Sequence, residues 1–244
     1  MTFLENNSTI SFVLPAFNEG EYIEESLKRL DSNCKKTKTR HHEILVVNDG
    51  SKDDTQQKAN KYAKKNKHVK IISYKRNEGK GFAVKAGALK ATGETIVLLD
   101  SDLDIDIKQV NKYIKALQQG DIVIGSKYHP QSKVKTTITR KILSRGFNKL
   151  TRLLTGVKIN DTQVGIKAIR RNNFFQIFNR LSVKRYAFDV ELMVLANIYN
   201  LKIIELPVKL KVQNKLNIKE IGNMFLDLLG IAYRLRIKQY YKRS

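Results

Sequence analysis

The chain has 244 residues, enough for one α/β domain with an appendage and a substantial buried core. Its net charge of +23 predicts an anionic partner, such as nucleic acid, a phospholipid surface or a phosphorylated substrate. The single cysteine, Cys34, excludes an internal disulfide and a cysteine-rich zinc site, and the sequence shows neither a signal peptide nor an apolar run long enough to span a bilayer.

Short apolar segments alternate with amphipathic segments along the chain. Strands are expected at residues 10–14, 43–47, 69–73, 95–99, 121–126, 166–169 and 203–208. Helices are expected near residues 20–31, 53–66, 81–91, 107–118, 141–154, 185–199 and 218–244, with a basic loop at 34–40. This alternation predicts an α/β fold whose mostly parallel central sheet is flanked by helices.

Four carboxylates follow the apolar strand at residues 95–99, at alternate positions from Asp100 to Asp106. A buried strand does not tolerate this density of charge, so we expect the carboxylates to lie in a cleft beyond its end. Crowded oxygen ligands favour Mg²⁺ or Mn²⁺, and a cation held there is well placed to neutralise a diphosphate. In the alternative interpretation, Asp102 or Asp104 only caps the helix near residues 107–118.

Polar side chains follow the carboxyl ends of all four leading strands. In a parallel sheet these ends share one edge, where ligands bind, although each cluster alone is ordinary turn chemistry. The turn after the first strand lacks G-x-G-x-x-G, and Gly79-Lys80-Gly81 lacks the P-loop pattern, so dinucleotide and P-loop sites are excluded. The clusters are Asn18/Glu19, Asn48/Asp49/Ser51, Asn77/Lys80 and Asp100/Asp102.

Two later segments are strongly basic. Residues 127–160 hold nine lysines and arginines and no acidic residue, which favours phosphate recognition over a merely solvated helix face. Residues 218–244 have apolar positions at helical spacing, followed by basic residues. This pattern predicts an amphipathic helix on an anionic membrane, while packing on the protein's own core or in an oligomer remains an alternative.

The spaced motifs resemble family 2 glycosyltransferases of the GT-A fold over nearly the whole chain, and within them the polyprenyl-phosphate sugar synthases. Residues 14–19, 47–55 and 76–84 are similar to the P-x-[YF]-N-E, [DN]-D-G-S-x-D-x-T and R-N-x-G-K-G-x-A-V segments, and Asp100-Ser101-Asp102 resembles the D-x-D motif. Residues 161–167 and 188–192 look like segments of the glucosyl branch. The Q-x-x-R-W motif of processive synthases is missing.

The resemblance implies a role for each matching residue. Asp100, Asp102 and Asp104 would hold Mg²⁺ or Mn²⁺, and Lys127, Arg140 and Arg145 would bind the acceptor phosphate. Arg is usual at the position of Lys127, and Lys binds phosphate as a point charge rather than a fork. Catalytic roles fall to Asp102, Asp161, Asp189 and Glu191. The nucleotide sugar would contact Pro15, Phe17, Asn18, Glu19, Asp49, Ser51, Asn77, Lys80, Gly81, Asp100, Ser101 and Asp102.

The implied function is an inverting transfer of a hexose from a nucleotide sugar, with UDP-glucose favoured, to a polyprenyl or dolichyl phosphate. Mannosyl transfer from GDP-mannose, a glycan or protein acceptor, and a basic nucleic-acid-binding protein remain as alternatives. The resemblance implies no nucleic-acid partner and leaves the oligomeric state open. We expect a glycosyltransferase domain at residues 1–215, a membrane-associating basic helix at 216–244, and a cytoplasmic location, peripheral to the cytoplasmic face of a membrane.

Overall fold

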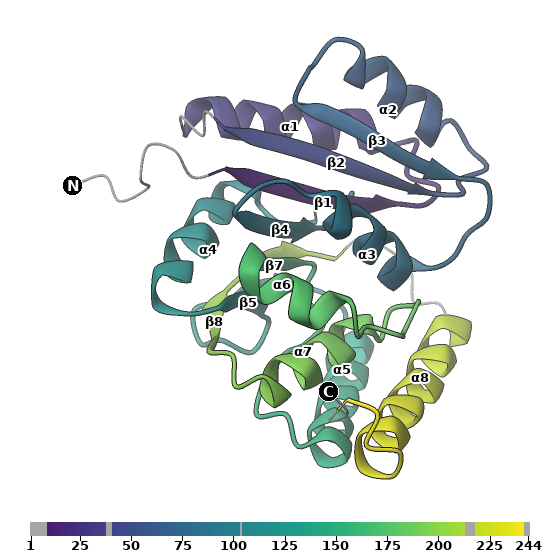
Figure 1. Cartoon of the computed structure of the whole chain (residues 1–244), viewed down its shortest axis with the longest axis vertical. Coiled ribbons are helices and arrows are strands. Elements are labelled where there is room, and N and C mark those ends of the chain that lie inside the picture. The colour runs from purple at the N-terminus through teal and green to yellow at the C-terminus, as the bar shows by residue number, and fades with distance from the viewer. Residues whose placement is uncertain (1–8, 38–40, 103, 213–217, 242–244) are drawn as a thin grey trace.

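The computed structural model describes residues 9–37, 41–102, 104–212 and 218–241, built around a seven-stranded sheet with the order β3-β2-β1-β4-β7-β5-β8 (Figure 1). Its strands are β1 (Ile10–Ala16), β2 (His42–Asp49), β3 (Val69–Tyr74), β4 (Thr95–Leu99), β5 (Ile122–Ser126), β7 (Ile166–Arg170) and β8 (Ile203–Pro207). A separate two-stranded sheet joins β6 (Lys133–Lys135) to β9 (Lys209–Lys211).

The helices are α1 (Ile23–Lys36), α2 (Thr55–Ala63), α3 (Lys80–Lys90), α4 (Val110–Ala116), α5 (Ile138–Thr155), α6 (Arg171–Phe178), α7 (Phe188–Ile198) and α8 (Ile218–Arg236), with 3₁₀ turns η1 (Ile107–Gln109) and η2 (Leu117–Gln119).

The main sheet is mostly parallel, as predicted. β1, β2, β3 and β4 pair in parallel, and so do β5 and β8. β7 runs antiparallel to both β4 and β5, because the chain enters this strand from the carboxyl edge of β4. At that point the backbone N–H of Asp100 donates to the carbonyl of Gly165 at 3.2 Å, which places the start of β7 beside the acidic stretch.

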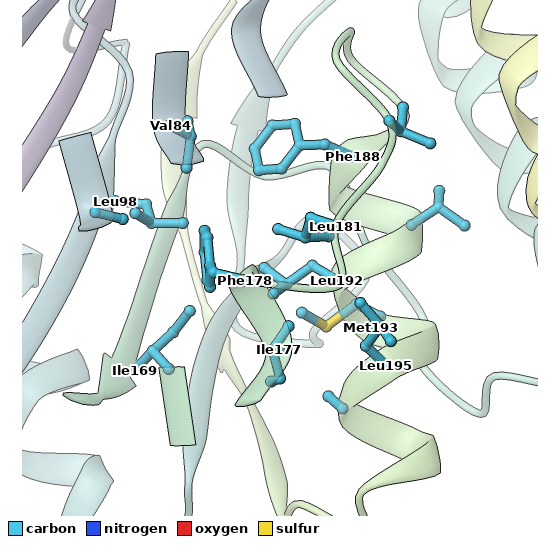
Figure 2. Packing of buried hydrophobic residues seen from close by; sticks show 14 of the residues in the cluster. Val84, Leu98, Ile169, Ile177, Phe178, Leu181, Phe188, Leu192, Met193 and Leu195 are labelled. Carbon is cyan, nitrogen blue, oxygen red and sulfur yellow. The ribbon is translucent and has the colours of Figure 1, made fainter. Parts of the chain in front are cut away.

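Side chains alternate between two hydrophobic clusters, one on each face of the sheet. In β1, Phe12 and Leu14 belong to the cluster covered by α1, α2 and α4, whereas Val13 belongs to the cluster under α3, α6 and α7. Figure 2 shows the second cluster, in which Phe178 lies among residues of α7 and β7. Burial is near-continuous along the inner strands β1, β2, β4, β7 and β5, as expected where helices cover both faces of a sheet, and less complete along the edge strands β3 and β8.

Three local features differ from the sequence-based expectation. α1 continues to Lys36 through the expected loop, because Cys34 extends the buried face formed by Leu27 and Leu30. The helix expected near residues 107–118 is a short α-helix flanked by η1 and η2. α6 and the β6–β9 sheet were not predicted, since such short elements carry little periodic signal.

The C-terminal helix packs on the body of the protein. Leu228 and Ile231 are fully buried, and the ring of Phe225 meets that of Phe147 of α5 edge to face at 5.5 Å. Beyond the helix, Tyr241 is also buried. The predicted domain boundary at residues 215/216 lies outside the described residues. Within the part of the chain that the structure describes, no helix combines the length and apolar character that crossing a membrane requires.

A buried carboxylate, Glu43, connects three strands near their amino ends. Its Oε1 accepts from Ser11 Oγ at 2.6 Å and from the backbone N–H and Oγ1 of Thr92 at 2.7 and 2.8 Å, and its Oε2 lies 2.8 Å from Lys70 Nζ. Burial alone would raise the pKa of Glu43, but Lys70 and the hydroxyl and backbone donors outweigh burial and lower it to about 2. The ionised carboxylate therefore stabilises the fold.

Replacing Glu43 with Gln is expected to lower the free energy of unfolding at neutral pH by about 2 to 3 kcal/mol. Because the folded-state pKa is depressed, this contribution is fully present above pH 4.5, the ordinary value, and is lost as the pH falls toward 2. Urea unfolding between those pH values measures it, with Glu94→Gln at an exposed position as the control. Equal stability of the two variants at pH 7 would contradict the assignment.

Candidate active site

The loops that follow β1, β2 and β3 hold one another through their predicted site residues. The backbone N–H of Asn18 donates to Ser51 Oγ at 3.0 Å, and Asn18 Oδ1 accepts from the N–H of Lys52 at 2.9 Å. Asp49 accepts from the N–H groups of Glu78 and Gly79 at 2.8 and 2.9 Å, which fixes the loop before α3. These polar side chains therefore build the carboxyl edge of the sheet as one connected surface.

Carboxylates crowd the next part of this edge, after β1 and β4. Burial and the charges of Asp102 and Asp100 raise the pKa of Glu19 to about 7. Burial and the charge of Asp100 likewise raise the pKa of Asp102 to about 6. Both shifts show that the protein's own cations do not fully compensate the negative charge here, and that an added cation would be favoured.

Lys80, the first residue of α3, supplies one cation to this cluster. Its Nζ lies 2.5 Å from Oδ1 of Asp100 and 5.8 Å from the centre of the Tyr186 ring. Burial alone would lower the pKa of Lys80, but the charges of Asp100 and Asp189 raise it above its ordinary value, so the lysine stays charged. Asp106, rather than Asp102 or Asp104, caps the following turn by accepting from the N–H of Lys108.

The approach of β7 to the acidic stretch requires a glycine at position 165. A Cβ atom there would lie 2.1 Å from Oδ2 of Asp100, far inside van der Waals contact. The segment from Asp161 to Gly165 therefore contributes the wall against which Asp100 is held.

Asp161 is fully buried and binds a predicted phosphate-binding residue. Its Oδ2 accepts from the backbone N–H of Lys127 at 2.8 Å, and its Oδ1 accepts from Lys127 Nζ at 3.0 Å and from the N–H of Gln163 at 3.1 Å. Lys127 and Gln163 line the cavity described below, whereas Asp161 does not. Its contacts are those of a residue that positions Lys127, and the catalytic role expected from the sequence stays a prediction.

Asp189 and Glu191, which were both predicted to be catalytic, occupy different environments. Asp189 lines the cavity and pairs with the buried Lys167 at 2.7 Å, so the two segments that resemble the glucosyl branch meet inside the protein. Burial raises the pKa of Asp189, and Lys167 opposes this shift.

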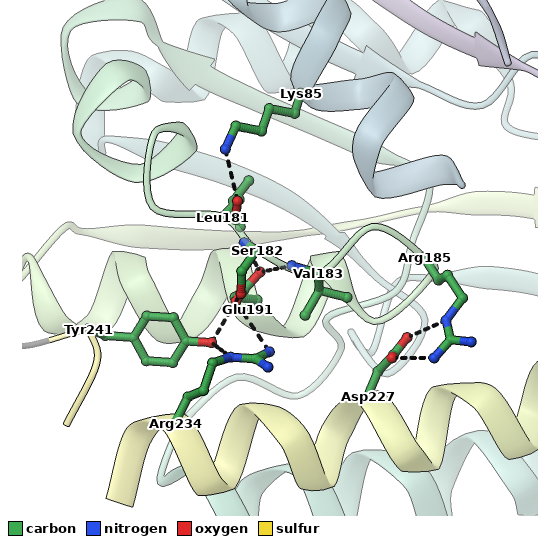
Figure 3. Close-up of polar contacts among 9 residues, drawn as sticks. All are labelled: Lys85, Leu181, Ser182, Val183, Arg185, Glu191, Asp227, Arg234 and Tyr241. Atoms are coloured by element: carbon green, nitrogen blue, oxygen red, sulfur yellow. Dashed lines mark hydrogen bonds and ion pairs between the residues drawn. The ribbon is translucent and has the colours of Figure 1, made fainter. Parts of the chain in front are cut away.

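Glu191 is not among the residues that line the cavity, and Figure 3 shows the polar contacts that hold it. Its Oε2 accepts from the N–H groups of Ser182 and Val183 at 2.9 and 2.7 Å. Its Oε1 accepts from the hydroxyls of Ser182 and Tyr241 at 2.6 and 2.5 Å, and Arg234 Nη2 lies 3.5 Å away. These contacts tie the C-terminal segment to the loop before α7, and the catalytic role expected from the sequence stays a prediction.

That loop carries Tyr186, a cavity residue that the sequence analysis did not single out. The neighbouring Arg185 donates from Nε and Nη2 to the two carboxylate oxygens of Asp227 on α8, at 3.2 and 2.6 Å (Figure 3). The backbone carbonyl of Lys184 accepts from the N–H of Phe82 on α3. Tyr186 lies just before α7 in the sequence, and no sequence pattern indicated that its ring would lie near Lys80.

A cavity of about 600 Å³ begins at the acidic edge and extends between α5 and α8. Its lining combines acidic, basic and apolar side chains. The acidic and neighbouring residues are Lys80, Asp100, Asp102, Asp104 and Asp189; the basic ones are Lys127, Arg140, Lys141 and Arg145; the apolar ones include Leu143, Phe147, Ile221, Met224 and Phe225.

The predicted nucleotide-sugar residues divide into two groups. Lys80, Asp100 and Asp102 line the cavity. The other nine do not line it, and those with described side-chain contacts hold the surrounding loops, as Asn18, Asp49 and Ser51 do. These nine are Pro15, Phe17, Asn18, Glu19, Asp49, Ser51, Asn77, Gly81 and Ser101.

The carboxylates fit a divalent cation that a ligand helps to hold. Across residues 9–37, 41–102, 104–212 and 218–241, no three His, Cys, Asp or Glu side chains are arranged to bind a metal by themselves. Mg²⁺ typically uses one or two carboxylates together with substrate phosphates. The raised pKa of Asp102 fits such a shared site, because a cation would relieve the repulsion between Asp100 and Asp102.

Comparison with known proteins adds a consistent set of relatives. Residues 11–178 match the family model described as glycosyl transferase family 2. A dolichyl-phosphate beta-glucosyltransferase of Trichomonas vaginalis is 35% identical over 240 residues, covering 93% of this chain and 71% of the relative. The human dolichyl-phosphate beta-glucosyltransferase is 34% identical over 214 residues, covering 82% of this chain and 66% of the relative.

Solved structures show the same fold. Glucosyl-3-phosphoglycerate synthase from Mycobacterium tuberculosis, in complex with UDP, superimposes with a TM-score of 0.71 at 21% identity, over 93% of this chain and 79% of that one. The predicted GT-A arrangement of a mostly parallel sheet flanked by helices is thereby confirmed.

Replacing Gly165 with Ala is expected to weaken Mn²⁺ binding in the presence of uridine diphosphate at least tenfold, because the new methyl group displaces Asp100. Isothermal titration calorimetry measures the affinity. Gly146→Ala is the matched control, since a Cβ there meets no atom within 4 Å. Unchanged Mn²⁺ affinity in Gly165→Ala would mean that Asp100 is not a ligand.

Replacing Glu191 with Gln is expected to cost about 3 kcal/mol of unfolding free energy, since buried donors and the Arg234 guanidinium lose their acceptor. Tyr241→Phe, which removes one of the hydrogen bonds, should cost about 1 kcal/mol. Chemical denaturation gives both values. Lost turnover with wild-type stability in Glu191→Gln would instead return this residue to catalysis.

Proposed function

The chain belongs to glycosyl transferase family 2 and is a glycosyltransferase, and from this premise we propose that it transfers glucose from UDP-glucose to dolichyl phosphate or a related polyprenyl phosphate. Relatives that carry the name dolichyl-phosphate beta-glucosyltransferase support the choice of sugar and acceptor, because they match over 93% or 82% of this chain at 34 or 35% identity. The product would be a glucosyl phosphate linked to a polyprenol.

The make-up of the cavity lining carries this proposal. A polyprenyl phosphate has an anionic head and an apolar tail, and the cavity is lined by both cations and apolar side chains. The same lining includes Asp100 and Asp102, where a nucleotide diphosphate and its metal ion would meet the phosphate head. A water-soluble acceptor would not require the apolar section formed by Phe147, Ile221 and Phe225.

At the donor end, Lys80 would contact the diphosphate as a charged donor, since Asp100 and Asp189 keep it protonated. A divalent cation held by Asp100 and Asp102, with Asp104 nearby, would supply charge neutralisation of the leaving diphosphate. Mg²⁺ and Mn²⁺ are both suited to these oxygen ligands. The Tyr186 ring, which packs near Lys80, limits where the sugar can lie.

At the acceptor end, Lys127, Arg140 and Arg145 would bind the lipid phosphate. Asp161 holds Lys127 through both its backbone N–H and its Nζ, so this lysine is oriented before the acceptor arrives. This orientation matters because the acceptor phosphate and the donor diphosphate, both anions, must be brought together. A phosphate-binding side chain that is already held in place lowers the entropic part of the activation barrier for transfer.

The reaction needs no dedicated base. A phosphate monoester is already an anion at neutral pH, so its oxygen can attack the anomeric carbon of glucose directly. The bond from that carbon to the diphosphate oxygen breaks, the electron pair leaves with UDP, and attack from the opposite face inverts the configuration. The chain's task would be positioning and charge stabilisation, and Asp189, which lines the cavity, would orient a sugar hydroxyl. A cytoplasmic location at a membrane surface, where such acceptors reside, is part of the same proposal.

Incubation of the chain with labelled UDP-glucose, a short polyprenyl phosphate and Mn²⁺ or Mg²⁺ is expected to give organic-soluble, acid-labile label. GDP-mannose is tested in parallel. Chelation with EDTA should abolish the product and added Mn²⁺ should restore it, while Asp102→Asn should lower turnover at least 100-fold. Product from GDP-mannose alone, or label only in a water-soluble acceptor, would overturn the donor or the acceptor proposal respectively.

Replacing Lys127 with Ala is expected to raise the KM for the polyprenyl phosphate at least tenfold and to leave the KM for UDP-glucose within about twofold, because a charged phosphate contact is worth about 1.5 to 3 kcal/mol. Asp161→Asn should move the same acceptor KM in the same direction, and Lys127→Arg should retain most activity. An effect of Asp161→Asn on the donor KM alone would contradict its assignment as the residue that positions Lys127.

A further inference from the structure

A second hollow, of about 760 Å³, lies outside the active-site cavity, between α1, η1 and the two-stranded β6–β9 sheet. Two aspartates, Asp104 and Asp106, also line it. The rest of its charged lining is basic and consists of Lys28, Arg29, Lys36, Lys108, Lys133, Lys135, Lys209 and Lys211.

Four of these lysines form one face of the small sheet, here named the lysine face: Lys133, Lys135, Lys209 and Lys211. In the parallel register, Lys133 lies opposite Lys209 and Lys135 lies opposite Lys211. The residues between them, Val134 and Leu210, both line the active-site cavity. The small sheet therefore separates the cavity from a surface on which like charges directly face each other, an arrangement that costs stability unless an anion is present.

The protein supplies little compensation for this charge. Lys209 lies 3.5 Å from Asp106. Among the residues that the structure describes, Lys133, Lys135 and Lys211 pair with no carboxylate, and neither do Lys36 and Lys108 nearby. An external anionic partner is the remaining source of compensation.

Exposed apolar side chains stand at the starts of α5 and α8, the helices that follow β6 and β9 in the chain. Ile138 begins α5 only three residues after Lys135 and is 76% exposed, and Ile142 follows one turn later at 65%. Ile218 begins α8 and is 85% exposed. Both helices line the active-site cavity with their first turns.

The combination of lysines and exposed isoleucines favours an anionic membrane over a nucleic acid as the partner. Lysines next to exposed isoleucines match the composition of surfaces that sit at a lipid interface, where apolar side chains enter the bilayer and lysines contact anionic headgroups. Single-stranded nucleic acids are usually bound by aromatic side chains on which bases stack, and the hollow has no aromatic residue in its lining.

We propose that the lysine face, together with Ile138, Ile142 and Ile218, docks this protein on an anionic lipid bilayer. This inference rests on the proposed function, which supplies the reason for docking. Val134 and Leu210 of the small sheet line the active-site cavity, so docking through the opposite face would bring the cavity close to the membrane that holds the acceptor. The surface lies on β6, β9 and the starts of two helices, and it differs from the basic C-terminal end of the tail that the sequence suggested.

Flotation with vesicles of phosphatidylcholine plus phosphatidylserine tests the proposal without any substrate. The chain is expected to float with these vesicles and not with vesicles of phosphatidylcholine alone, and added salt should release it. The fourfold variant Lys133→Gln/Lys135→Gln/Lys209→Gln/Lys211→Gln should bind roughly 600-fold more weakly, since each of the four lysines near an anionic surface is worth about fivefold.

A matched variant removes the same charge elsewhere: Lys61→Gln/Lys64→Gln/Lys65→Gln/Lys67→Gln, at exposed positions on and after α2. It should float like the parent chain. If both fourfold variants lost vesicle binding equally, net charge alone would explain the binding and the docking surface would be overturned. Flotation of the lysine-face variant at the wild-type level would also overturn it. Ile138→Ser/Ile142→Ser should weaken flotation as well, and Leu153→Ser, at another exposed position of α5, should not.

Failure of this inference can be distinguished from failure of the proposed function. The lysine-face variant should glucosylate a short, water-soluble polyprenyl phosphate at the wild-type rate and lose activity only on acceptor embedded in phosphatidylserine vesicles. Wild-type activity of this variant on the embedded acceptor would overturn the docking surface alone. A parent chain that floats through this face yet transfers glucose to neither acceptor would overturn the proposed function alone. Salt-sensitive binding of RNA, without flotation, would assign the face to nucleic acid.

Discussion

The repulsion among carboxylates at the carboxyl end of β4 is the constraint on which the site depends. Burial, together with the charges of Asp100 and Asp102, raises the pKa of Glu19, and burial with the charge of Asp100 raises that of Asp102. Lys80 offsets part of the negative charge from the start of α3. A divalent cation would neutralise the remainder, and on the proposed function the donor diphosphate would lie beside it.

Around this cluster, residues with buried charges serve to position others. Asp161 holds Lys127 and Lys167 holds Asp189, and both Lys127 and Asp189 line the cavity. Glu191 joins the loop that carries Tyr186 to the C-terminal segment, and Arg185 joins the same loop to α8 through Asp227. The C-terminal helix α8 therefore belongs to the same structural unit as the site. It lines the cavity and also anchors the loop that carries Tyr186.

The small β6–β9 sheet lies between the proposed acceptor site and the proposed bilayer contact, both of which would use the positive charge of the chain. Its apolar side faces the cavity through Val134 and Leu210, and its lysines face the second hollow. One thin element thus lies between the proposed acceptor site and the proposed bilayer contact. The excess positive charge of the chain is thus concentrated at two places: around Lys127 and Arg140 in the cavity, and on the lysine face outside it.

The sequence by itself determined the α/β class and the strands of the main sheet, because apolar periodicity is a local property, and the parallel order then predicted the edge at which the polar clusters meet. The resemblance to a known family pointed to Asp100, Asp102 and Lys127, all of which line the cavity. Only the tertiary structure separated Asp189 from Glu191, which lie two residues apart in one motif yet face the cavity and the C-terminal tail respectively. The pairing of β6 with β9, the position of Tyr186 and the packing of α8 were decided by contacts between distant segments, which no local pattern records.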